Sequence, residues 1–128
     1  MTELIAPLSF KSGATLKNRF VLAPLTNLQS QPDGVLTDDE FTWLTKRAEG
    51  GFALTMTCAA SVQESGVGFP GQLGFHDEKH LPGLTRLAAA IKANGSHAVG
   101  QLHHGGLRSL TNPKAPSADE KLGAQAMT

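Results

Sequence analysis

The chain has 128 residues, of which 40% are hydrophobic and 17% charged, and its 11 basic residues balance its 11 acidic ones. This length and composition fit one domain with a hydrophobic core, and the zero net charge favours neither nucleic acid nor an anionic membrane as a partner. The single cysteine, Cys58, excludes an internal disulfide and fits a reducing compartment. We therefore expect a cytoplasmic α/β protein with no signal peptide and no membrane-spanning segment.

The N-terminal residues predict a short hairpin and then a strand. Residues 7–17 alternate hydrophobic and polar positions on either side of Ser12-Gly13, a turn signal, which indicates a β-hairpin. Residues 20–23 form a hydrophobic run that Pro24 follows. A proline just past the end of a strand removes no ladder hydrogen bond, so we expect a buried strand over residues 20–23.

A helix is predicted after the polar, turn-rich residues 27–36. Thr37 is a typical N-cap residue, and Glu40 three positions later fits a capping box, in which each side chain bonds the backbone N–H of the other residue. Glycines at positions 50–51 end the helix. The hydrophobic residues that share one face of this helix are Phe41, Leu44 and Ala48.

Two further strands and a second helix follow. Residues 52–57 predict a strand, and a glycine-rich loop separates it from a helix that begins near Leu81 and is closed by Asn94-Gly95. Residues 97–102 predict the third strand, and the residues after it show no pattern, which predicts a loop. The order is therefore a hairpin followed by β-α-β-α-β.

Alternating strands and helices imply a parallel sheet with right-handed crossovers, but three strands fit either a doubly wound sheet or a closed barrel. No G-x-G-x-x-G motif follows the first strand, which disfavours a dinucleotide-binding domain. Thr128 is a helix N-cap residue type after a loop. Two open sheet edges would also leave backbone groups and strand faces exposed, so we expect the natural chain to continue.

In parallel β/α folds, functional residues gather at the carboxyl ends of the strands. The segments at these three ends resemble the Old Yellow Enzyme family of FMN-dependent oxidoreductases, which includes NADH:flavin oxidoreductases and ene-reductases. The order and spacing of the matching pieces make the likeness specific. The pieces are LKNRFVLAPLT at 16–26, RAEGG at 47–51, GQLG at 71–74, LPGL at 81–84, QLHHG at 101–105, APSA at 115–118 and MT at 127–128.

The resemblance implies an α/β fold, the N-terminal part of a (β/α)8 TIM barrel. Residues 1–128 would form a single partial domain, in which 7–17 is the hairpin that closes the bottom of the barrel. Residues 18–128 would supply the first three barrel strands with two helices and the following loop. A barrel truncated here would lack the family's substrate-binding pair, its proton-donating tyrosine and its phosphate site, and the chain contains no tyrosine.

The resemblance also implies one wall of an FMN site at the three strand ends. Thr26 matches the position that faces the flavin O4 and tunes the flavin reduction potential. Ala59 matches a residue whose backbone meets the pyrimidine end of the ring, and Gln101 matches a glutamine that offers one donor and one acceptor to the same edge. The candidate cofactor-binding residues are Ala23, Pro24, Leu25, Thr26, Ala59 and Gln101.

The activity that the resemblance implies is hydride transfer from NAD(P)H through FMN to a small-molecule substrate, an activated alkene such as an enone. The catalytic acid is unknown, because it lies outside these residues in the family, and we therefore expect the chain alone to be inactive. The alternative is a non-catalytic truncated barrel fragment that folds only by self-association, as a homo-oligomer. Retained flavin in the purified protein would distinguish the two hypotheses.

Several residues depart from the family pattern or suggest other chemistry. Cys58 stands where the family often has an acidic residue, Leu107 where arginine is usual, and Leu28 where one subgroup has tyrosine. His76 and His80 have the i, i+4 spacing of metal ligands, but they precede the predicted helix, so we expect a solvated loop and no metal. We also expect two histidines to pack and orient the third strand-end loop. These are His103 and His104.

Overall fold

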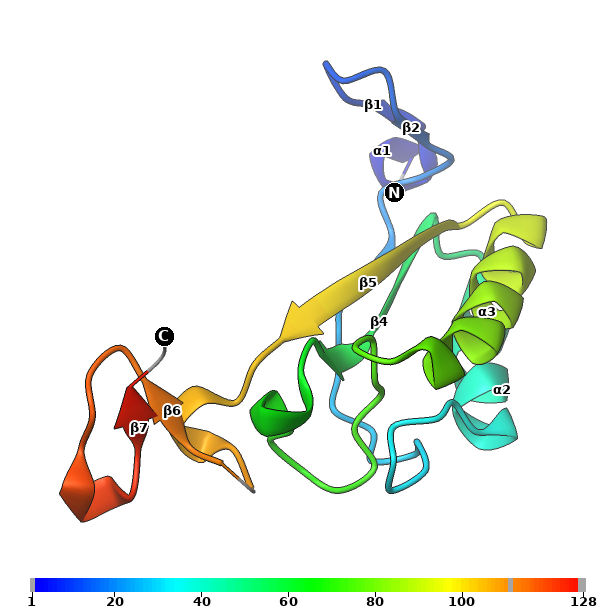
Figure 1. Cartoon of the computed structure of the whole chain (residues 1–128). Coiled ribbons are helices and arrows are strands. Elements are labelled where there is room, and N and C mark those ends of the chain that lie inside the picture. The colour runs from blue at the N-terminus through cyan, green and yellow to red at the C-terminus, as the bar shows by residue number, and fades with distance from the viewer. Residues whose placement is uncertain (1, 111, 127–128) are drawn as a thin grey trace.

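The centre of the molecule is a three-stranded parallel sheet that two helices cover on one face (Figure 1). The computed structural model describes residues 2–110 and 112–126. The strand order β3-β4-β5 follows the chain, and the hydrogen-bonded neighbours are parallel. The strands are β3 (Val21–Leu22), β4 (Leu54–Ser61) and β5 (His97–His103), and the helices are α2 (Asp38–Glu49) and α3 (Leu81–Ala93). The predicted β-α-β-α-β order is therefore confirmed.

The predicted hairpin is present at the end of the sheet where β5 begins. Strand β1 (Leu8–Ser9) pairs antiparallel with β2 (Thr15–Leu16), and a short helix that the sequence did not predict, α1 (Thr2–Ile5), precedes them. The His97 Nε2 lies 3.0 Å from the Thr15 carbonyl oxygen, a contact that joins the hairpin to the first residue of β5. In Figure 1 the hairpin accordingly lies beyond the starts of β4 and β5.

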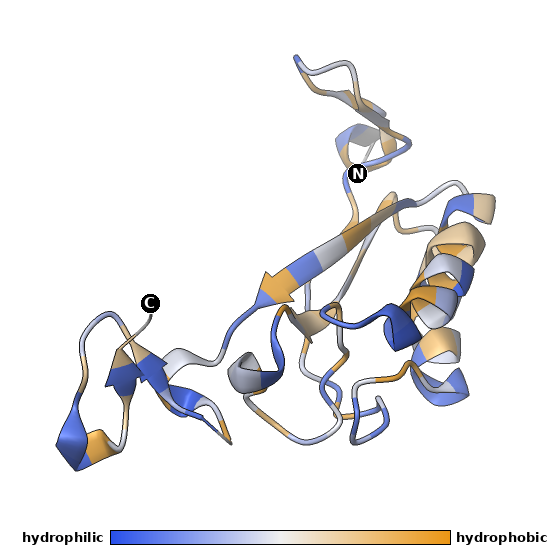
Figure 2. Ribbon diagram, viewed as in Figure 1, coloured by the Kyte–Doolittle hydropathy of each residue, from blue (hydrophilic) through white to orange (hydrophobic). Residues whose placement is uncertain are grey.

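The main hydrophobic core lies between the helices and the sheet. Leu44 and Ala48 of α2 meet Leu87 and Ile91 of α3, and all four side chains are buried. Leu44 and Ala48 belong to the hydrophobic face that the sequence predicts for α2, so this face is confirmed. Burial of each large side chain contributes about 2 kcal/mol to folding. Figure 2 shows hydrophobic residues on these helices where they approach the sheet.

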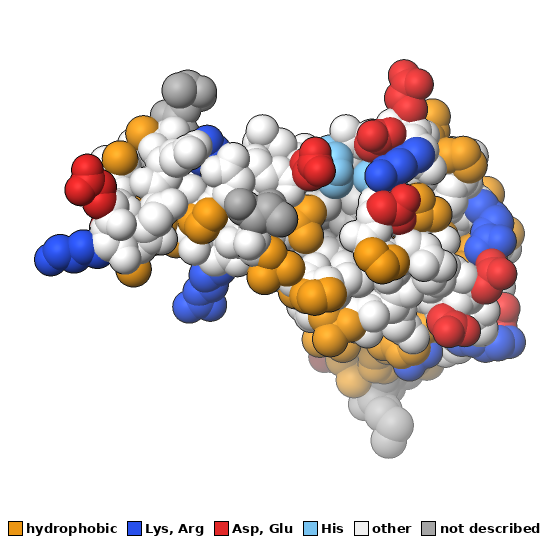
Figure 3. Space-filling view, turned by 60° about the horizontal axis from the view of Figure 1, so that its bottom comes forward, with side chains coloured by type: hydrophobic (Ala, Val, Ile, Leu, Met, Phe, Trp, Pro, Cys, Tyr) orange, Lys and Arg blue, Asp and Glu red, His pale blue; other side chains and the backbone are white. Residues whose placement is uncertain are grey.

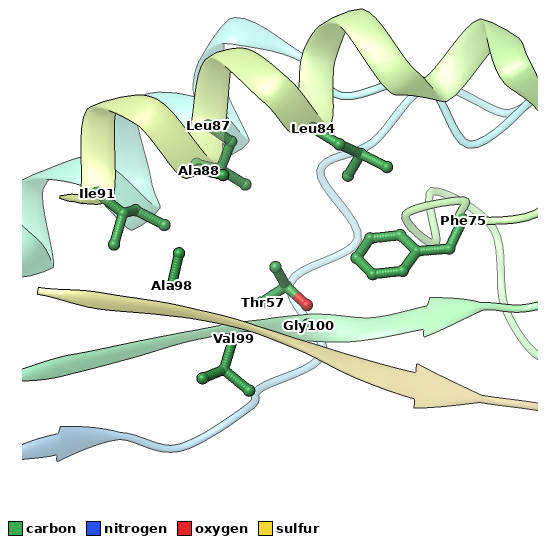
Figure 4. A pocket seen from close by; sticks show the side chains of 9 residues that line it. All are labelled: Thr57, Phe75, Leu84, Leu87, Ala88, Ile91, Ala98, Val99 and Gly100. Carbon is green, nitrogen blue, oxygen red and sulfur yellow. The ribbon is translucent and has the colours of Figure 1, made fainter. Parts of the chain in front are cut away.

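A hydrophobic cavity of about 180 Å³ lies at the outer part of the same interface, between α3 and β5 (Figure 4). Leu84 and Ile91 of α3 approach it from one side and Ala98 of β5 from the other, while Phe75 closes one end. The cavity therefore belongs to the contact between helix and sheet. Among the described residues, no helix is long and hydrophobic enough to cross a bilayer.

The expectation that residues 20–23 form a buried strand is wrong. Only Val21 and Leu22 pair in β3, and Phe20 and Val21 are 43% and 45% exposed. The physical reason is that, among the described residues, β3 has a neighbouring strand on one side alone. The other two strands are longer than predicted, because β4 continues to Ser61 and β5 to His103.

The expectation of an unpatterned loop after the third strand is also wrong. This region forms an arm that extends from the sheet in Figure 1, in which β6 (Lys114–Ala115) pairs with β7 (Gln125–Ala126). The Asp119 carboxylate accepts hydrogen bonds from two backbone N–H groups in the turn between these strands, a local bond pattern typical of aspartate. The predicted helix start at Thr128 lies outside the described residues.

Candidate functional site

The structure brings the ends of the three strands to one edge of the sheet. Strands β4 and β5 are parallel, and Ala59 is the register partner of Gln101. A register shift between Met56 and Ala59 marks an irregularity just before this pair. Residues 23–26 continue from β3, which runs parallel to β4. Two of the three predicted strand ends are therefore direct neighbours, and the third approaches them from the other side of β4.

The segment after β3 presents an open surface. Leu25 is 54% exposed, Ala23 and Thr26 are exposed, and Pro24 is half-buried. Because alanine and proline carry small side chains, a flat aromatic ring can approach the main chain here. The backbone and side chains of this segment are therefore accessible to a ligand.

Gln101 is half-buried, and its backbone and side chain have different roles. The backbone N–H donates to Thr57 Oγ1 at 3.1 Å, and this hydroxyl donates to the Cys58 carbonyl oxygen at 2.8 Å. Within the described residues, the Gln101 carboxamide has no hydrogen-bond partner. One donor group and one acceptor therefore remain free beside Ala59, and these are the groups that the edge of a flavin pyrimidine ring requires.

Gln72 is a buried residue of the site that the sequence reasoning missed. It is 3% exposed, and its Nε2 donates to the Ala59 carbonyl oxygen at 2.9 Å and to His103 Nδ1 at 3.0 Å. Its Oε1 accepts from the Gly68 backbone N–H at 2.8 Å. Gln72 thus joins the ends of β4 and β5. The available signal was a carboxamide inside the GQLG motif, because a buried carboxamide needs several partners.

The predicted capping box at the start of α2 is half right. Thr37 Oγ1 accepts from the Glu40 N–H at 3.2 Å, as expected. The Glu40 carboxylate does not reach back, which corrects the sequence interpretation. It is fully buried and accepts hydrogen bonds from Asn27 Nδ2 at 3.3 Å, from Cys58 Sγ at 3.0 Å and from the Ser30 hydroxyl. The carboxylate therefore bonds donors on the neighbouring loop and on β4 and does not bond the Thr37 backbone N–H at the helix N-terminus.

Cys58 is held as a neutral thiol. It is 2% exposed, and burial raises the pKa of its thiol far above the ordinary value. The hydrogen bond to Glu40 and the charge of that carboxylate raise this pKa further, while the Asn27 backbone N–H lowers it. Because only a thiolate is a strong nucleophile, Cys58 acts as a small buried donor.

The histidines of the strand-end loops have packing contacts. His76 Nδ1 lies 3.2 Å from the Ser61 hydroxyl, and His80 Nε2 lies 3.1 Å from the Asp33 carbonyl oxygen. The two rings meet edge to face at 4.9 Å. His104 Nδ1 accepts from the Gly106 N–H at 3.0 Å, a contact that orients the third loop as expected. In the part of the chain that the structure describes, no three acidic, histidine or cysteine side chains gather as metal ligands do.

Parallel β/α units whose strand ends meet at one edge place the chain in the class of parallel α/β proteins. A family model described as the NADH:flavin oxidoreductase / NADH oxidase family matches residues 3–127, and the chain belongs to this family. It is 41% identical over 104 residues to the probable NADH-dependent flavin oxidoreductase YqiG of Bacillus subtilis, covering 81% of this chain and 28% of that protein. It is 36% identical over 124 residues to the NADH:acrylate oxidoreductase of Vibrio harveyi, covering 97% of this chain and 12% of that protein.

A solved structure confirms the fold. The Old Yellow Enzyme homologue from Zymomonas mobilis matches with a TM-score of 0.80 and 28% identity, over 91% of this chain and 34% of that one. The chain therefore spans about a third or less of the relatives described, and it has the fold of the N-terminal part of their β/α barrel. The predicted fold class and the predicted resemblance to Old Yellow Enzyme are both confirmed.

Proposed function

We propose that this chain supplies one wall of the FMN site of an NAD(P)H-dependent oxidoreductase that reduces activated alkenes. The observation that carries the proposal is the pairing of Ala59 with Gln101 at the ends of β4 and β5, beside the exposed segment after β3. The residues that we assign to FMN are Ala23, Pro24, Leu25, Thr26, Ala59 and Gln101.

Each assigned group has a contact that it can make with a flavin. The free Gln101 carboxamide can donate to one atom of the pyrimidine edge and accept from another. The exposed hydroxyl of Thr26 can donate to a flavin carbonyl and so stabilise the extra negative charge of the reduced ring. The chemistry that FMN supplies is hydride transfer. The described residues hold and tune the ring, and we assign no proton-transfer step to them.

The proposed substrate class rests on a relative. The name of the Vibrio harveyi protein specifies acrylate, a compound whose C=C bond is conjugated to a carboxylate. An electron-withdrawing group of this kind makes the β-carbon of an alkene an acceptor for hydride. We therefore propose α,β-unsaturated carbonyl or carboxyl compounds as substrates and a reduced nicotinamide as the electron donor.

The test is anaerobic reduction of acrylate and of a cyclic enone by a complete barrel that contains these residues, with FMN and with either NADH or NADPH, because one wall of a flavin site supplies no catalytic acid. We expect a saturated product that forms only when FMN is present. The same protein without added FMN, after removal of any bound flavin, is the control. Oxidation of the nicotinamide with both alkenes left unreduced would contradict the proposed substrate class.

The exposed sheet edge favours a second candidate, a non-catalytic assembly in which copies of the chain pair with one another. Leu102 of β5 is 67% exposed, and Leu107 and Leu110 just beyond it are 47% and 57% exposed. Figure 3 shows hydrophobic side chains gathered along one face of the molecule. A surface of this kind is covered in most soluble proteins, and a second copy of the chain is one way to cover it.

A further inference from the structure

Glu40 is a charged side chain in the interior of the molecule, next to the candidate site. It is 0% exposed, although it belongs to the first turn of α2. Its three side-chain hydrogen-bond donors come from two separate parts of the chain. Asn27 and Ser30 follow the first strand end, and Cys58 directly precedes Ala59 on β4. One carboxylate therefore contacts the neighbours of two proposed FMN contacts.

A carboxylate is costly to bury unless donors replace its hydration. Here the donors are a hydroxyl, an amide and a thiol, and the N-terminus of α2 favours negative charge in the same turn. Within the described residues, no lysine or arginine forms an ion pair with Glu40. Among the described residues, hydrogen bonds and no ion pair compensate the burial of this carboxylate. Its loss therefore leaves two buried donors, Ser30 and Cys58, without their acceptor.

The two oxygens of the Glu40 carboxylate join different segments of the chain. Glu40 Oε1 accepts from both Asn27 Nδ2 and Cys58 Sγ, so the segment after β3 and the end of β4 meet at a single oxygen atom. Oε2 accepts from Ser30, whose backbone N–H donates to the Gly71 carbonyl oxygen at 3.1 Å. The loop after β3 is thus held at Asn27 and at Ser30. Both residues bond to Glu40, which also accepts the bond from Cys58 of β4.

We propose that Glu40 is a positioning residue, which fixes the segment after β3 against the end of β4 and so sets the spacing between the Thr26 and Ala59 contacts with FMN. The reference to FMN rests on the proposed function, whereas the bracing of the two strand ends does not. Among the described residues, the Glu40 side chain forms no hydrogen bond with a residue assigned to FMN, so it acts through Asn27 and Cys58.

Hydrogen exchange in flavin-free protein tests the bracing. In Glu40→Gln, an NH2 group replaces one acceptor oxygen, and we expect the amides of residues 26–30 and 57–61 to exchange about tenfold faster, while those of α3 keep their rates. Asp39→Asn is the matched control, because it removes an exposed carboxylate from the same turn. Cys58→Ala is the second variant; it removes the bond to β4 alone, and we expect faster exchange mainly at 57–61.

The affinity for FMN is the second readout. We expect Glu40→Gln to raise the dissociation constant about tenfold, and Asp39→Asn to leave it unchanged. Exchange that is unchanged in both variants would overturn the positioning role. Exchange that rises uniformly and includes α3 would also overturn it, and would show a general contribution of Glu40 to stability. Local exchange changes with unchanged FMN affinity would overturn the role in the FMN site. A wild-type protein that binds no FMN would contradict the proposed function, and the exchange pattern would still decide the bracing.

Discussion

Replacement of Gln101 by leucine is expected to weaken the binding of FMN about 10- to 100-fold. Leucine keeps the size of the side chain but removes both hydrogen-bonding groups, which have no partner among residues 2–110 and 112–126. An unpaired polar group on a bound flavin costs about 1–3 kcal/mol. The backbone N–H of this residue, which donates to Thr57, is unaffected by the change. Titration of flavin-free protein with FMN, followed by quenching of flavin fluorescence, measures the effect.

Gln63→Leu is the matched control for this change. Gln63 is an exposed glutamine in extended backbone just past the end of β4, and its side chain caps no helix. The same substitution there should leave FMN binding unchanged. Equal dissociation constants for wild type and Gln101→Leu would remove Gln101 from the site, and equal losses in both variants would show a nonspecific effect of added hydrophobic surface.

A second large effect is expected from Gly71→Ala, which should lower the free energy of unfolding by about 3 kcal/mol. Gly71 has φ +68°, a left-handed conformation that costs other residues energy. A Cβ atom there would also lie 2.8 Å from the carbonyl oxygen of Leu28, a backbone atom that cannot rotate away. Relief of this clash requires movement of residues 28–30, which lie against Gly71. Denaturant titration measures the loss.

Gly123→Ala separates the two causes. Gly123 has φ +64°, almost the same conformation, but a Cβ atom there meets nothing within 4 Å. Its substitution should therefore cost only the conformational part, about 1 kcal/mol. If the two variants lost the same stability, the close approach of Gly71 to Leu28 would carry no energetic weight.

The elements of this fold could be predicted from the sequence because each has a local signal. Helical spacing at Leu44 and Ala48, glycines at 50–51 and the turn at Ser12-Gly13 identified α2 and the hairpin. The exposure of β3 could not be predicted in this way. A hydrophobic run indicates that a strand can be buried, but it does not indicate whether other strands lie on both sides of it. The arm could not be predicted for a different reason. Its strands β6 and β7 have two residues each, too few to show an alternation of hydrophobic and polar residues.

The candidate site was predictable only where the family motifs fall on strand ends. These motifs supplied the residues on β4 and β5 and the run after β3, and the structure brings Ala59 and Gln101 together. Glu40 and Gln72 lie outside the strands and contact the site through bonds between residues distant in the sequence. The same sequence pattern that identified Glu40 as half of a capping box gave no sign that its carboxylate is buried.

The visible spectrum of the purified protein, recorded after addition of FMN and removal of free flavin by gel filtration, tests the central claim most directly. We predict a retained flavin band with altered fine structure, because the ring would lie against the backbone of residues 23–26 and the Gln101 carboxamide. A colourless protein that elutes as a multimer would contradict the FMN site and would favour the assembly in which copies of the chain pair their open sheet edges.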